Sequence, residues 1–452
     1  MTLTTNLDLG IDPETDDPSG AQLLTTALSI LAGHERAARQ VINLVPAENA
    51  MWPIARLPLI ADLASRYMFD QHPDPDCAQW RFPGAREAQW LETGLTVPLL
   101  QRMLGSAHVN VRPLSGLQAM EMTLACYPAG APVAVLSPSQ GGHYATADIA
   151  RRLGQHVLTV TGPDPHRLDL GQLAGLCATK RPALFYIDQC HALMPYDIAA
   201  ITDTVKEASP GTVVHADISH LLGLVLGGAV PNPLDCGADS LSASTHKSFP
   251  GPQKGILATN RSGIAASWQL VQPQLISSHH FGSVAALGLA LASFADRAGD
   301  YANTVVACAR SLGKHLASAG WDVAGADIGY THTHQLWVTT TPRLAARVAA
   351  ERLYAAGIRV NWLEDLPLGH PALRLGLAEA VWCGLAPADM PFLAQLIDQA
   401  LTGAREPADI ATDVAVLRTG ERFPFAVHPD EAATTALGEV TALLGGEVGG
   451  TS

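Results

Sequence analysis

The sequence predicts an α/β fold: a large domain with a mostly parallel seven-stranded sheet, followed by a smaller C-terminal α+β domain. At 452 residues the chain is long for a single hydrophobic core. Short, nearly continuous apolar runs alternate with helical stretches or glycine-containing turns, which is typical of strands buried on both faces of a parallel sheet. After a long apolar helix, strand and helix patterns continue on a smaller scale, which indicates a second domain.

The first elements are predicted to form an N-terminal arm, residues 1–45. Apolar residues at helical spacing predict an amphipathic helix over 21–41 that packs on a partner subunit: Leu23, Leu24, Leu28, Leu31 and Ala37. An extended segment over 42–53 and a helix over 57–67 follow. The loop over 68–84 is rich in proline, aspartate and tryptophan, and so long a loop in a compact domain is usually functional or disordered.

The large domain is expected over 46–300 and the small domain over 301–452. A helix over 91–104 leads into the first strand, and a Pro-Leu-Ser-Gly turn leads into a helix that begins near Leu117. A long helix over 284–317 is expected to join the domains. The strands are expected at 108–112, 133–136, 156–160, 183–187, 213–216, 240–242 and 255–258.

Composition argues against several classes of function. The net charge is −14 and basic residues form no run, so binding to nucleic acid or to an anionic membrane is not expected. Seven scattered cysteines without a CxxC motif argue against a disulfide framework or a zinc site, and favour a reducing cytoplasm. The acidic N-terminus is unlike a signal peptide, and the most apolar run, 284–294, is far shorter than a membrane span. We expect a cytoplasmic protein without a bound metal.

An aspartate and a lysine thirty residues apart indicate the chemistry. Asp217 ends one buried strand, and Lys247 follows another, after the small-residue run SLSAST. An enzyme that uses pyridoxal 5'-phosphate needs this pair, because the lysine forms an imine with the cofactor aldehyde and the carboxylate keeps the pyridine nitrogen protonated. A lone loop lysine is most often a surface residue, and Asp217 alone could be a helix cap. Together they favour a cofactor site, since an unpaired buried carboxylate is costly.

Other residues complete a candidate site. Ser115 and Gly116 open a helix after a strand, where backbone N–H groups and the helix dipole attract a phosphate. His143, after two glycines, is placed to stack on the pyridine ring, and His220 to adjoin it. Each has an ordinary alternative: many strand-to-helix turns contain Ser-Gly, and loop or core histidines are common.

Two residues are candidates for the substrate. Arg374, in HPALRLGLAE, is the best candidate to bind a substrate carboxylate through a bidentate pair, and an ordinary surface arginine is the alternative. Tyr67, just before the irregular loop, is placed to supply a hydroxyl group. A core tyrosine at a helix end is the alternative.

These motifs together resemble the serine hydroxymethyltransferase family, pyridoxal-phosphate enzymes of fold type I. The resemblance spans about residues 40 to 400, through LVPAEN (44–49), SGLQA (115–119), GGH (141–143), ADISHLLGLV (216–225), STHK (244–247) and LRLG (373–376). It implies that Leu117 belongs to the phosphate turn, that Thr245 and His246 contact the cofactor beside the lysine, and that Glu48 lies near the substrate.

The departures from this pattern concern the second substrate. Hydroxymethyltransferases carry a Tyr-x-Glu-Gly-Tyr-Pro-Gly segment that serves folate chemistry, whereas here Phe69 replaces the glutamate. Leu117 replaces a small residue, and LAEAVWCG (377–384) replaces Thr-Pro-x-x-Thr-x-Arg-Gly. SFPGPQKG (248–255), with IDQ (187–189), QWRFPG (79–84) and THTHQ (331–335), resembles the L-threonine transaldolase branch of natural-product pathways.

The resemblance therefore implies a transaldolase that cleaves L-threonine to acetaldehyde and a glycine carbanion, and adds the glycyl unit to another aldehyde. The product would be a β-hydroxy-α-amino acid. A serine hydroxymethyltransferase or a simple threonine aldolase is the alternative, and a non-catalytic paralogue is a third. The family also implies a homodimer with shared active sites, to which the arm and SSHHFG (277–282) contribute.

Overall fold

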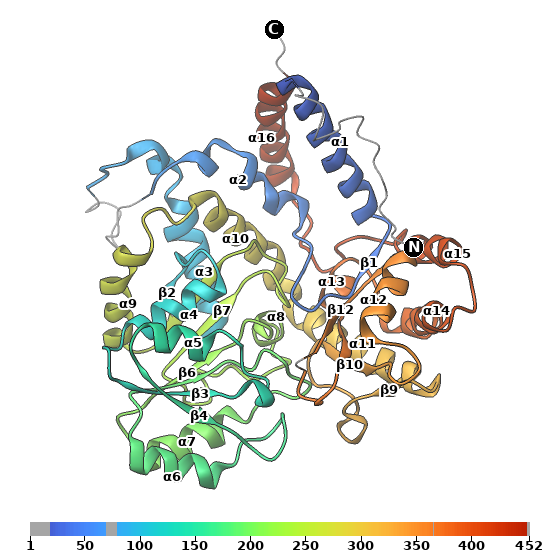
Figure 1. The fold of residues 1–452 in the computed structure, drawn as a ribbon. Coiled ribbons are helices and arrows are strands. Elements are labelled where there is room, and N and C mark those ends of the chain that lie inside the picture. The colour runs from blue at the N-terminus through green and yellow to red at the C-terminus, as the bar shows by residue number, and fades with distance from the viewer. Residues whose placement is uncertain (1–18, 69–78, 365, 450–452) are drawn as a thin grey trace.

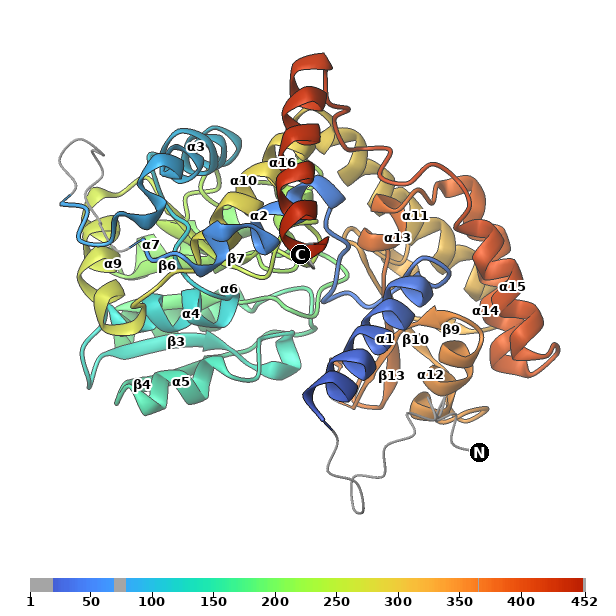
Figure 2. The same cartoon turned by 90° about the horizontal axis from the view of Figure 1, so that it is seen from above.

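The computed structural model describes residues 19–68, 79–364 and 366–449. They form a large lobe around a seven-stranded sheet and a smaller lobe around a four-stranded sheet, which lie side by side in Figure 2. Two helices, α1 (Gly20–Ala38) and α16 (Glu431–Gly449), stand out at the upper end of Figure 1.

The large sheet contains the seven predicted strands, each within two residues of its expected ends. The order is β2-β8-β7-β6-β5-β3-β4. The pairs β3–β4, β3–β5, β5–β6 and β6–β7 are parallel, whereas β8 runs antiparallel to both of its neighbours. The predicted mostly parallel sheet is therefore confirmed. Its strands are β2 (His108–Asn110), β3 (Pro132–Leu136), β4 (His156–Val160), β5 (Leu184–Ile187), β6 (Val213–Asp217), β7 (Ser240–Ser244) and β8 (Gly255–Thr259).

Helices cover both faces of this sheet, because successive side chains of a strand point to opposite faces. In β3, Leu136 packs into the cluster that holds α6 and α7, while Val135 packs into the cluster that holds α4 and α5. Both faces are thus apolar, as the unbroken apolar runs predicted. The helices are α4 (Gly116–Ala125), α5 (Thr146–Arg152), α6 (Leu170–Lys180), α7 (Ile198–Ala208), α8 (Leu222–Leu226) and α9 (Ser262–Leu275).

The single long helix expected over 284–317 is wrong. It is two helices, α10 (Phe281–Phe294) and α11 (Ala298–Ser318), separated by a 3₁₀ turn. The turn lets α10 stay within the large lobe while α11 packs on the smaller one (Figure 2). Within the described part of the chain, only Phe281–Ser318 is long and apolar enough to cross a membrane, and 67% of its most apolar window is buried, as in a core helix.

The smaller lobe has a sheet of order β12-β13-β10-β9; α11 and α12 pack against this sheet, and α14 packs against both of these helices. A separate parallel pair joins β1 (Ile42–Asn43) to β11 (Ile358–Arg359). The chain therefore enters the smaller lobe before it builds the larger one. The remaining elements are β9 (Asp322–Val323), β10 (Gln335–Thr339), β12 (Asn361–Leu363), β13 (Ala372–Gly376), α12 (Ala346–Ala355), α13 (Ala378–Trp382), α14 (Met390–Thr402) and α15 (Pro407–Leu417).

The predicted N-terminal helices differ in outcome. The helix expected over 21–41 is confirmed as α1, which has no buried residue. The helix expected over 57–67 is reduced to α2 (Leu57–Ile60) and a 3₁₀ turn, because Ala61 between them is extended. The helix expected over 91–104 is a π-helical turn, Leu91–Thr96, that continues into α3 (Val97–Leu104).

A buried ionic cluster lies beside β2. Arg112 Nε donates to Glu92 Oε1 at 3.0 Å, and His279 Nε2 lies 2.7 Å from Glu92 Oε2. The Lys254 amine, almost wholly buried, donates to the carbonyl oxygen of His279 at 2.7 Å. Burial lowers the pKa of Lys254 to about 7, although the charge of Glu92 opposes the shift.

Replacing Lys254 by methionine should change how stability depends on pH. An unfolded lysine has a pKa of about 10.4, so between pH 7 and 10 the unfolded chain binds more protons than the folded one, and the free energy of unfolding rises with pH. Lys254→Met lacks this rise. From pH 7 to 9.5 the wild type should gain up to about 3 kcal/mol over the variant in urea denaturation. If the free energies of unfolding of the wild type and Lys254→Met differed by the same amount at pH 7 and pH 9.5, the prediction would be contradicted.

Candidate active site

The carboxyl ends of β6 and β7 bring the predicted pair to one cavity. Asp217 is the last residue of β6, and Lys247 lies three residues beyond Ser244, the last residue of β7. Ligand sites of open α/β sheets collect at this edge. The cavity is lined by Gly116, Leu117, Met120, His143, Asp188, Gln189, Cys190, Asp217, Ser219, His220, Ser244 and Lys247.

The Asp217 carboxylate accepts three hydrogen bonds. The Ser219 N–H donates to Oδ1 at 2.8 Å, and the hydroxyl groups of Ser242 and Tyr186 donate to Oδ2 at 2.8 and 3.1 Å. Helix α8 begins only at Leu222, without a side-chain cap, so the interpretation of Asp217 as a helix cap is wrong. The three donors fix the carboxylate at the cavity wall.

The Lys247 amine is partly buried in the same cavity. Burial is the largest effect on its pKa and lowers it, the charge of Asp217 raises it, and Arg374 lowers it further. A lowered pKa favours the neutral amine, which is the nucleophilic form. The Lys247 carbonyl oxygen accepts a hydrogen bond from Asn49 Nδ2 at 2.8 Å, which ties the LVPAEN segment to the lysine.

The turn before α4 has the predicted form. Ser115 caps the helix, with its Oγ accepting from the Gln118 N–H at 3.1 Å. A Cβ at position 116 would lie 2.0 Å from Ser244 Oγ, so any residue other than glycine there would require the Ser244 side chain to move. Leu117 follows at the cavity wall, and the first N–H groups of α4 begin at this point, where an anion is favoured.

His143, in the GGH motif, and Asp188, in the IDQ motif, line the same cavity. Burial lowers the pKa of His143, so its ring is neutral at pH 7, and its Nδ1 accepts from the Ala145 N–H at 3.2 Å. Asp188 directly follows β5 and accepts a hydrogen bond from the Thr146 hydroxyl group. Burial raises the pKa of Asp188 well above its usual range.

Arg374, on β13 of the smaller lobe, lies beside the cavity and contacts two residues that line it, Cys190 and His220. Its Nε donates to Gln335 Oε1 at 2.9 Å, and its Nη2 donates to the Cys190 carbonyl oxygen at 2.8 Å. Gln335 Nε2 donates to the same carbonyl at 3.1 Å, and His220 Nε2 lies 3.3 Å from Arg374 Nη2. Arg374 is therefore no surface arginine but a buried, fixed guanidinium beside the site.

Six predicted site residues do not line this cavity: Ser115 and Arg374, which lie directly beside it, and Tyr67, Thr245, Glu48 and His246. Tyr67 is 41% exposed, and its Oη bonds Ser277 Oγ at 2.7 Å. Thr245 is buried, with its hydroxyl group donating to Pro252. Glu48 and His246 line a separate cavity beside α1. Within one chain the structure does not bring these side chains to the wall that Lys247 and Asp217 share.

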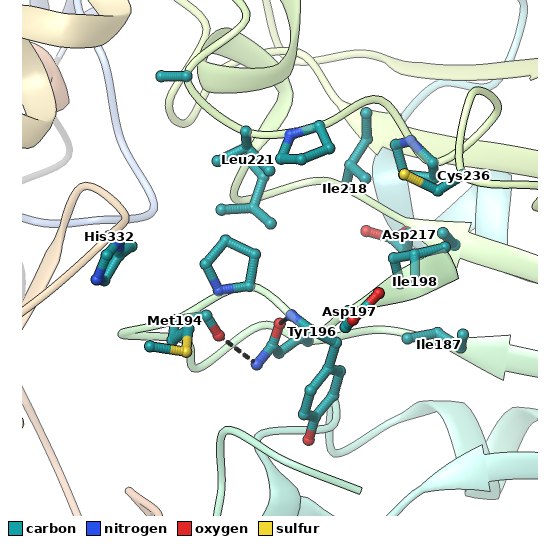
Figure 3. A pocket seen from close by; sticks show the side chains of 17 residues that line it. Ile187, Met194, Tyr196, Asp197, Ile198, Asp217, Ile218, Leu221, Cys236 and His332 are labelled. Carbon is teal, nitrogen blue, oxygen red and sulfur yellow. Dashed lines mark hydrogen bonds between the residues drawn. The ribbon is translucent and has the colours of Figure 1, made fainter. Parts of the chain in front are cut away.

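A larger cavity also borders Asp217 (Figure 3). It has a volume of about 380 Å³, and its walls are mostly apolar: Ile187, Met194, Ile198, Ile218 and Leu221. Gln189 and Asp217 line both cavities, and the Gln189 amide donates a hydrogen bond to the Met194 carbonyl oxygen at 2.9 Å. None of the described residues that line this cavity is a lysine or an arginine, so the amine chemistry belongs to the smaller cavity.

The smaller cavity fits pyridoxal phosphate. The Lys247 amine, whose pKa is lowered, suits the cofactor aldehyde, and the Asp217 carboxylate suits the pyridine nitrogen. The N-terminal end of α4 suits the phosphate, because Gly116 has no side chain there. His143 supplies a neutral ring at the same wall. The four groups come from different strand ends and converge because the sheet is parallel.

Several residues at the site were missed by sequence reasoning. Asp188 had a signal, since a carboxylate directly after a buried strand resembles the case of Asp217. Gln335 and Tyr186 had none, because their roles depend on the pairing of distant strands and on how the lobes meet.

Three comparisons find proteins similar to this chain. The family model of serine hydroxymethyltransferase matches residues 101–397. An L-threonine:uridine-5'-aldehyde transaldolase of a Streptomyces species is 40% identical over 409 residues, 90% of this chain and 95% of its own. A serine hydroxymethyltransferase of Pyrobaculum calidifontis is 31% identical over 431 residues, 92% and 97% of the two chains. The crystal structure of L-threonine transaldolase from Pseudomonas fluorescens in internal aldimine state shares the fold, with a TM-score of 0.82, 24% identity and coverage of 93% and 97%.

Proposed function

Because the chain belongs to the serine hydroxymethyltransferase family, we propose that it is a pyridoxal-phosphate-dependent L-threonine transaldolase. It cleaves L-threonine to acetaldehyde and a glycyl carbanion, and adds the glycyl unit to a second aldehyde to give a β-hydroxy-α-amino acid. The observation that carries the proposal is the 40% identity, over nine-tenths of the chain, to a protein named as such a transaldolase. Identity to the Pyrobaculum hydroxymethyltransferase is lower, 31%.

Bound pyridoxal phosphate supplies the electron sink for the carbanion. Lys247 Nζ is the amine that would hold the cofactor aldehyde, and its lowered pKa favours the neutral form, which can also accept a proton. Asp217 would accept the pyridine N–H, and its fixed negative charge keeps that nitrogen protonated. His143, neutral at pH 7, would cover the ring without adding a charge.

Arg374 would bind the carboxylate of L-threonine. Its guanidinium is held by Gln335 and by the Cys190 carbonyl, so little ordering is required when the substrate arrives. A carboxylate fixed at this point restricts rotation of the rest of the substrate and thereby presents one bond at Cα for cleavage. Orientation of the Cα–Cβ bond, rather than proton removal from Cα, is what a transaldolase requires.

The second substrate of the proposed reaction is the aldehyde that accepts the glycyl unit. Phe69, which replaces the glutamate used in folate chemistry, lies outside the described residues, and its identity alone supports a folate-independent reaction. The Streptomyces relative is named for uridine-5'-aldehyde, so a nucleoside-derived aldehyde is the first acceptor to test. We place the enzyme in the cytoplasm and in a natural-product pathway of the antibiotic type.

The test uses purified protein with pyridoxal phosphate, L-threonine and a panel of acceptors that includes uridine-5'-aldehyde, benzaldehyde and no aldehyde. Acetaldehyde is trapped as a hydrazone, and new amino acids are identified by mass. We expect an accepted aldehyde to increase acetaldehyde release and to yield a product whose mass is the sum of glycine and the aldehyde.

Other outcomes identify the alternatives. Equal yields of glycine and acetaldehyde, whatever the acceptor, would indicate a threonine aldolase. Stimulation of L-serine cleavage by tetrahydrofolate would indicate a hydroxymethyltransferase. A cofactor band that no amino acid changes would indicate a non-catalytic paralogue.

We also propose that the protein is a homodimer in which α1 packs on the partner subunit. Leu24, Leu28 and Leu31 lie on one face of α1 and are 60%, 55% and 57% exposed. A helix of 19 residues without a buried side chain is not stabilised by its own chain. The Leu28→Asp/Leu31→Asp variant should therefore shift the dimer to monomer in sedimentation experiments, by desolvation of a charge within the interface.

The matched control places the same charges on the other face of α1. Thr26→Asp/Ser29→Asp should leave the sedimentation coefficient unchanged. Dissociation by both variants would indicate that the charges only unfold α1, and dissociation by neither would remove α1 from the interface.

A further inference from the structure

A chain of buried hydrogen bonds runs behind Asp217, away from the cavity. Ser242 Oγ, which donates to Asp217, lies 2.9 Å from His215 Nε2, and His215 Nδ1 lies 2.8 Å from Ser240 Oγ. The strand register produces this row, because His215 pairs with Ser240 and Asp217 with Ser242 along β6 and β7. Tyr186 of β5 stacks on the His215 ring, with centroids 4.8 Å apart.

The directions of these hydrogen bonds follow from one another. The Ser242 proton points to Asp217, so Ser242 Oγ accepts, and His215 Nε2 must carry the proton. Burial lowers the pKa of His215 to about 4, so the ring is neutral, its Nδ1 is an acceptor, and Ser240 donates to it. The row therefore runs from Ser240 through His215 and Ser242 to Asp217.

We propose that His215 is a positioning residue for the cofactor: by fixing the Ser242 proton, it holds Asp217 in the orientation that receives the pyridine nitrogen. Neither His215 nor Ser242 lines the cavity. The inference deepens the proposed function and rests on it only for the identity of the cofactor.

Counting acceptor positions shows which oxygen is left for the cofactor. Asp217 Oδ2 receives both Ser242 and Tyr186, which occupy its two lone pairs. Oδ1 receives only the Ser219 N–H and keeps one lone pair. If Ser242 turned its proton elsewhere, Oδ2 would have a lone pair open, and the carboxylate would no longer present a single acceptor.

Burial makes His215 difficult to replace in this role. His215 and Ser242 are wholly buried, at 0% exposure, so no bulk water substitutes for a lost donor. Without the His215 N–H, the one remaining side-chain neighbour of Ser242 Oγ besides Asp217 that the described residues supply is Tyr186 Oη, 3.2 Å away, and Tyr186 donates its own proton to Asp217. Tyr186 keeps its own proton, since burial and the charge of Asp217 raise its pKa.

The experiment compares His215→Phe, Ser242→Ala and the double variant, with His215→Gln as the conservative replacement. Two readouts require no substrate: the dissociation constant of pyridoxal phosphate, and the ¹⁵N chemical shift of the labelled cofactor nitrogen, which reports its protonation. Melting temperatures of the cofactor-free proteins measure damage to the fold.

Ser242→Ala should weaken cofactor binding by about tenfold or more, the scale of a hydrogen bond to a charged group, and lower the protonated fraction of the nitrogen. His215→Phe should have a smaller effect in the same direction, and His215→Gln, which retains an N–H donor, should restore much of it. Because His215 acts through Ser242, the double variant should bind no more weakly than Ser242→Ala.

His166→Phe is the matched control. The His166 ring also stacks on an aromatic residue, Trp337, at 5.7 Å, but it has no bond to the Asp217 row. It should change neither readout. Additive effects of His215→Phe and Ser242→Ala, or a nitrogen shift unchanged in both, would overturn the inference without touching the transaldolase test. If His215→Phe does not fold, His215→Gln in the Ser242→Ala background decides the same question.

Discussion

Replacing Lys247 by alanine is expected to lower the rate of L-threonine cleavage by on the order of 10⁴-fold or more, the scale on which loss of a catalytic nucleophile acts. The lysine is the amine that lines the cavity with Asp217, and without it no imine to the protein forms. The visible absorption band of the lysine-bound cofactor should vanish, while non-covalent binding of pyridoxal phosphate persists, since Asp217 and the α4 start remain. Absorbance and single-turnover acetaldehyde release measure the two effects.

Lys314→Ala is the control, because Lys314 is an exposed lysine on α11 and does not line the cavity. It should retain both the band and the rate. A Lys247→Ala protein that kept the imine band would show that another lysine holds the cofactor, and the assignment of the site would fail.

Replacing Arg374 by methionine is expected to raise KM for L-threonine by about a hundredfold, because a charge-assisted bidentate pair to a carboxylate contributes about 3 kcal/mol. Turnover should also fall, since the substrate is no longer oriented. Binding of threoninol, which lacks the carboxylate, should be unchanged. Gln335→Leu removes the support of Arg374 Nε and should raise KM by a smaller factor, about tenfold, with little change for threoninol.

Arg310→Met is the matched control for this experiment. Arg310 likewise donates to a backbone carbonyl, that of Thr331, and lies 2.8 Å from a histidine nitrogen, but its partners Thr331 and His332 do not line the cavity, whereas Cys190 and His220 beside Arg374 do. Its KM should match the wild type. If Arg374→Met weakened threoninol as much as L-threonine, Arg374 would be supporting the lobe contact and not the carboxylate.

The sequence predicted those features that short segments determine. Each strand of the large sheet was visible as an apolar run, because both faces of the sheet are covered. The helix start at Ser115 and Gly116 was visible because the turn and the helix are adjacent in the sequence. Lys247 and Asp217 were predicted as partners because parallel strands end at the same edge.

The sequence did not predict features that depend on long-range register. The row behind Asp217 requires His215 of β6 to lie opposite Ser240 of β7, which no local pattern specifies. The support of Arg374 by Gln335 requires β10 to pair with β13 and both to meet the Cys190 loop. No proline lies between α10 and α11, so the sequence does not indicate that the helix is interrupted there. The interruption arises because one part of this apolar stretch packs in the large lobe and the other part on the smaller lobe.

The pairing of β1 with β11 bears on how the chain folds during synthesis. Ile42 and Asn43 leave the ribosome early, but their partners Ile358 and Arg359 appear only near the end, and Asn43 also bonds Glu379, 336 residues later. Closing so long a loop is slow and entropically costly, so the N-terminal segment remains unpaired while the large sheet assembles. Completion of the smaller lobe is therefore a late, post-translational event, and a nascent chain stalled before residue 358 would display that segment to chaperones.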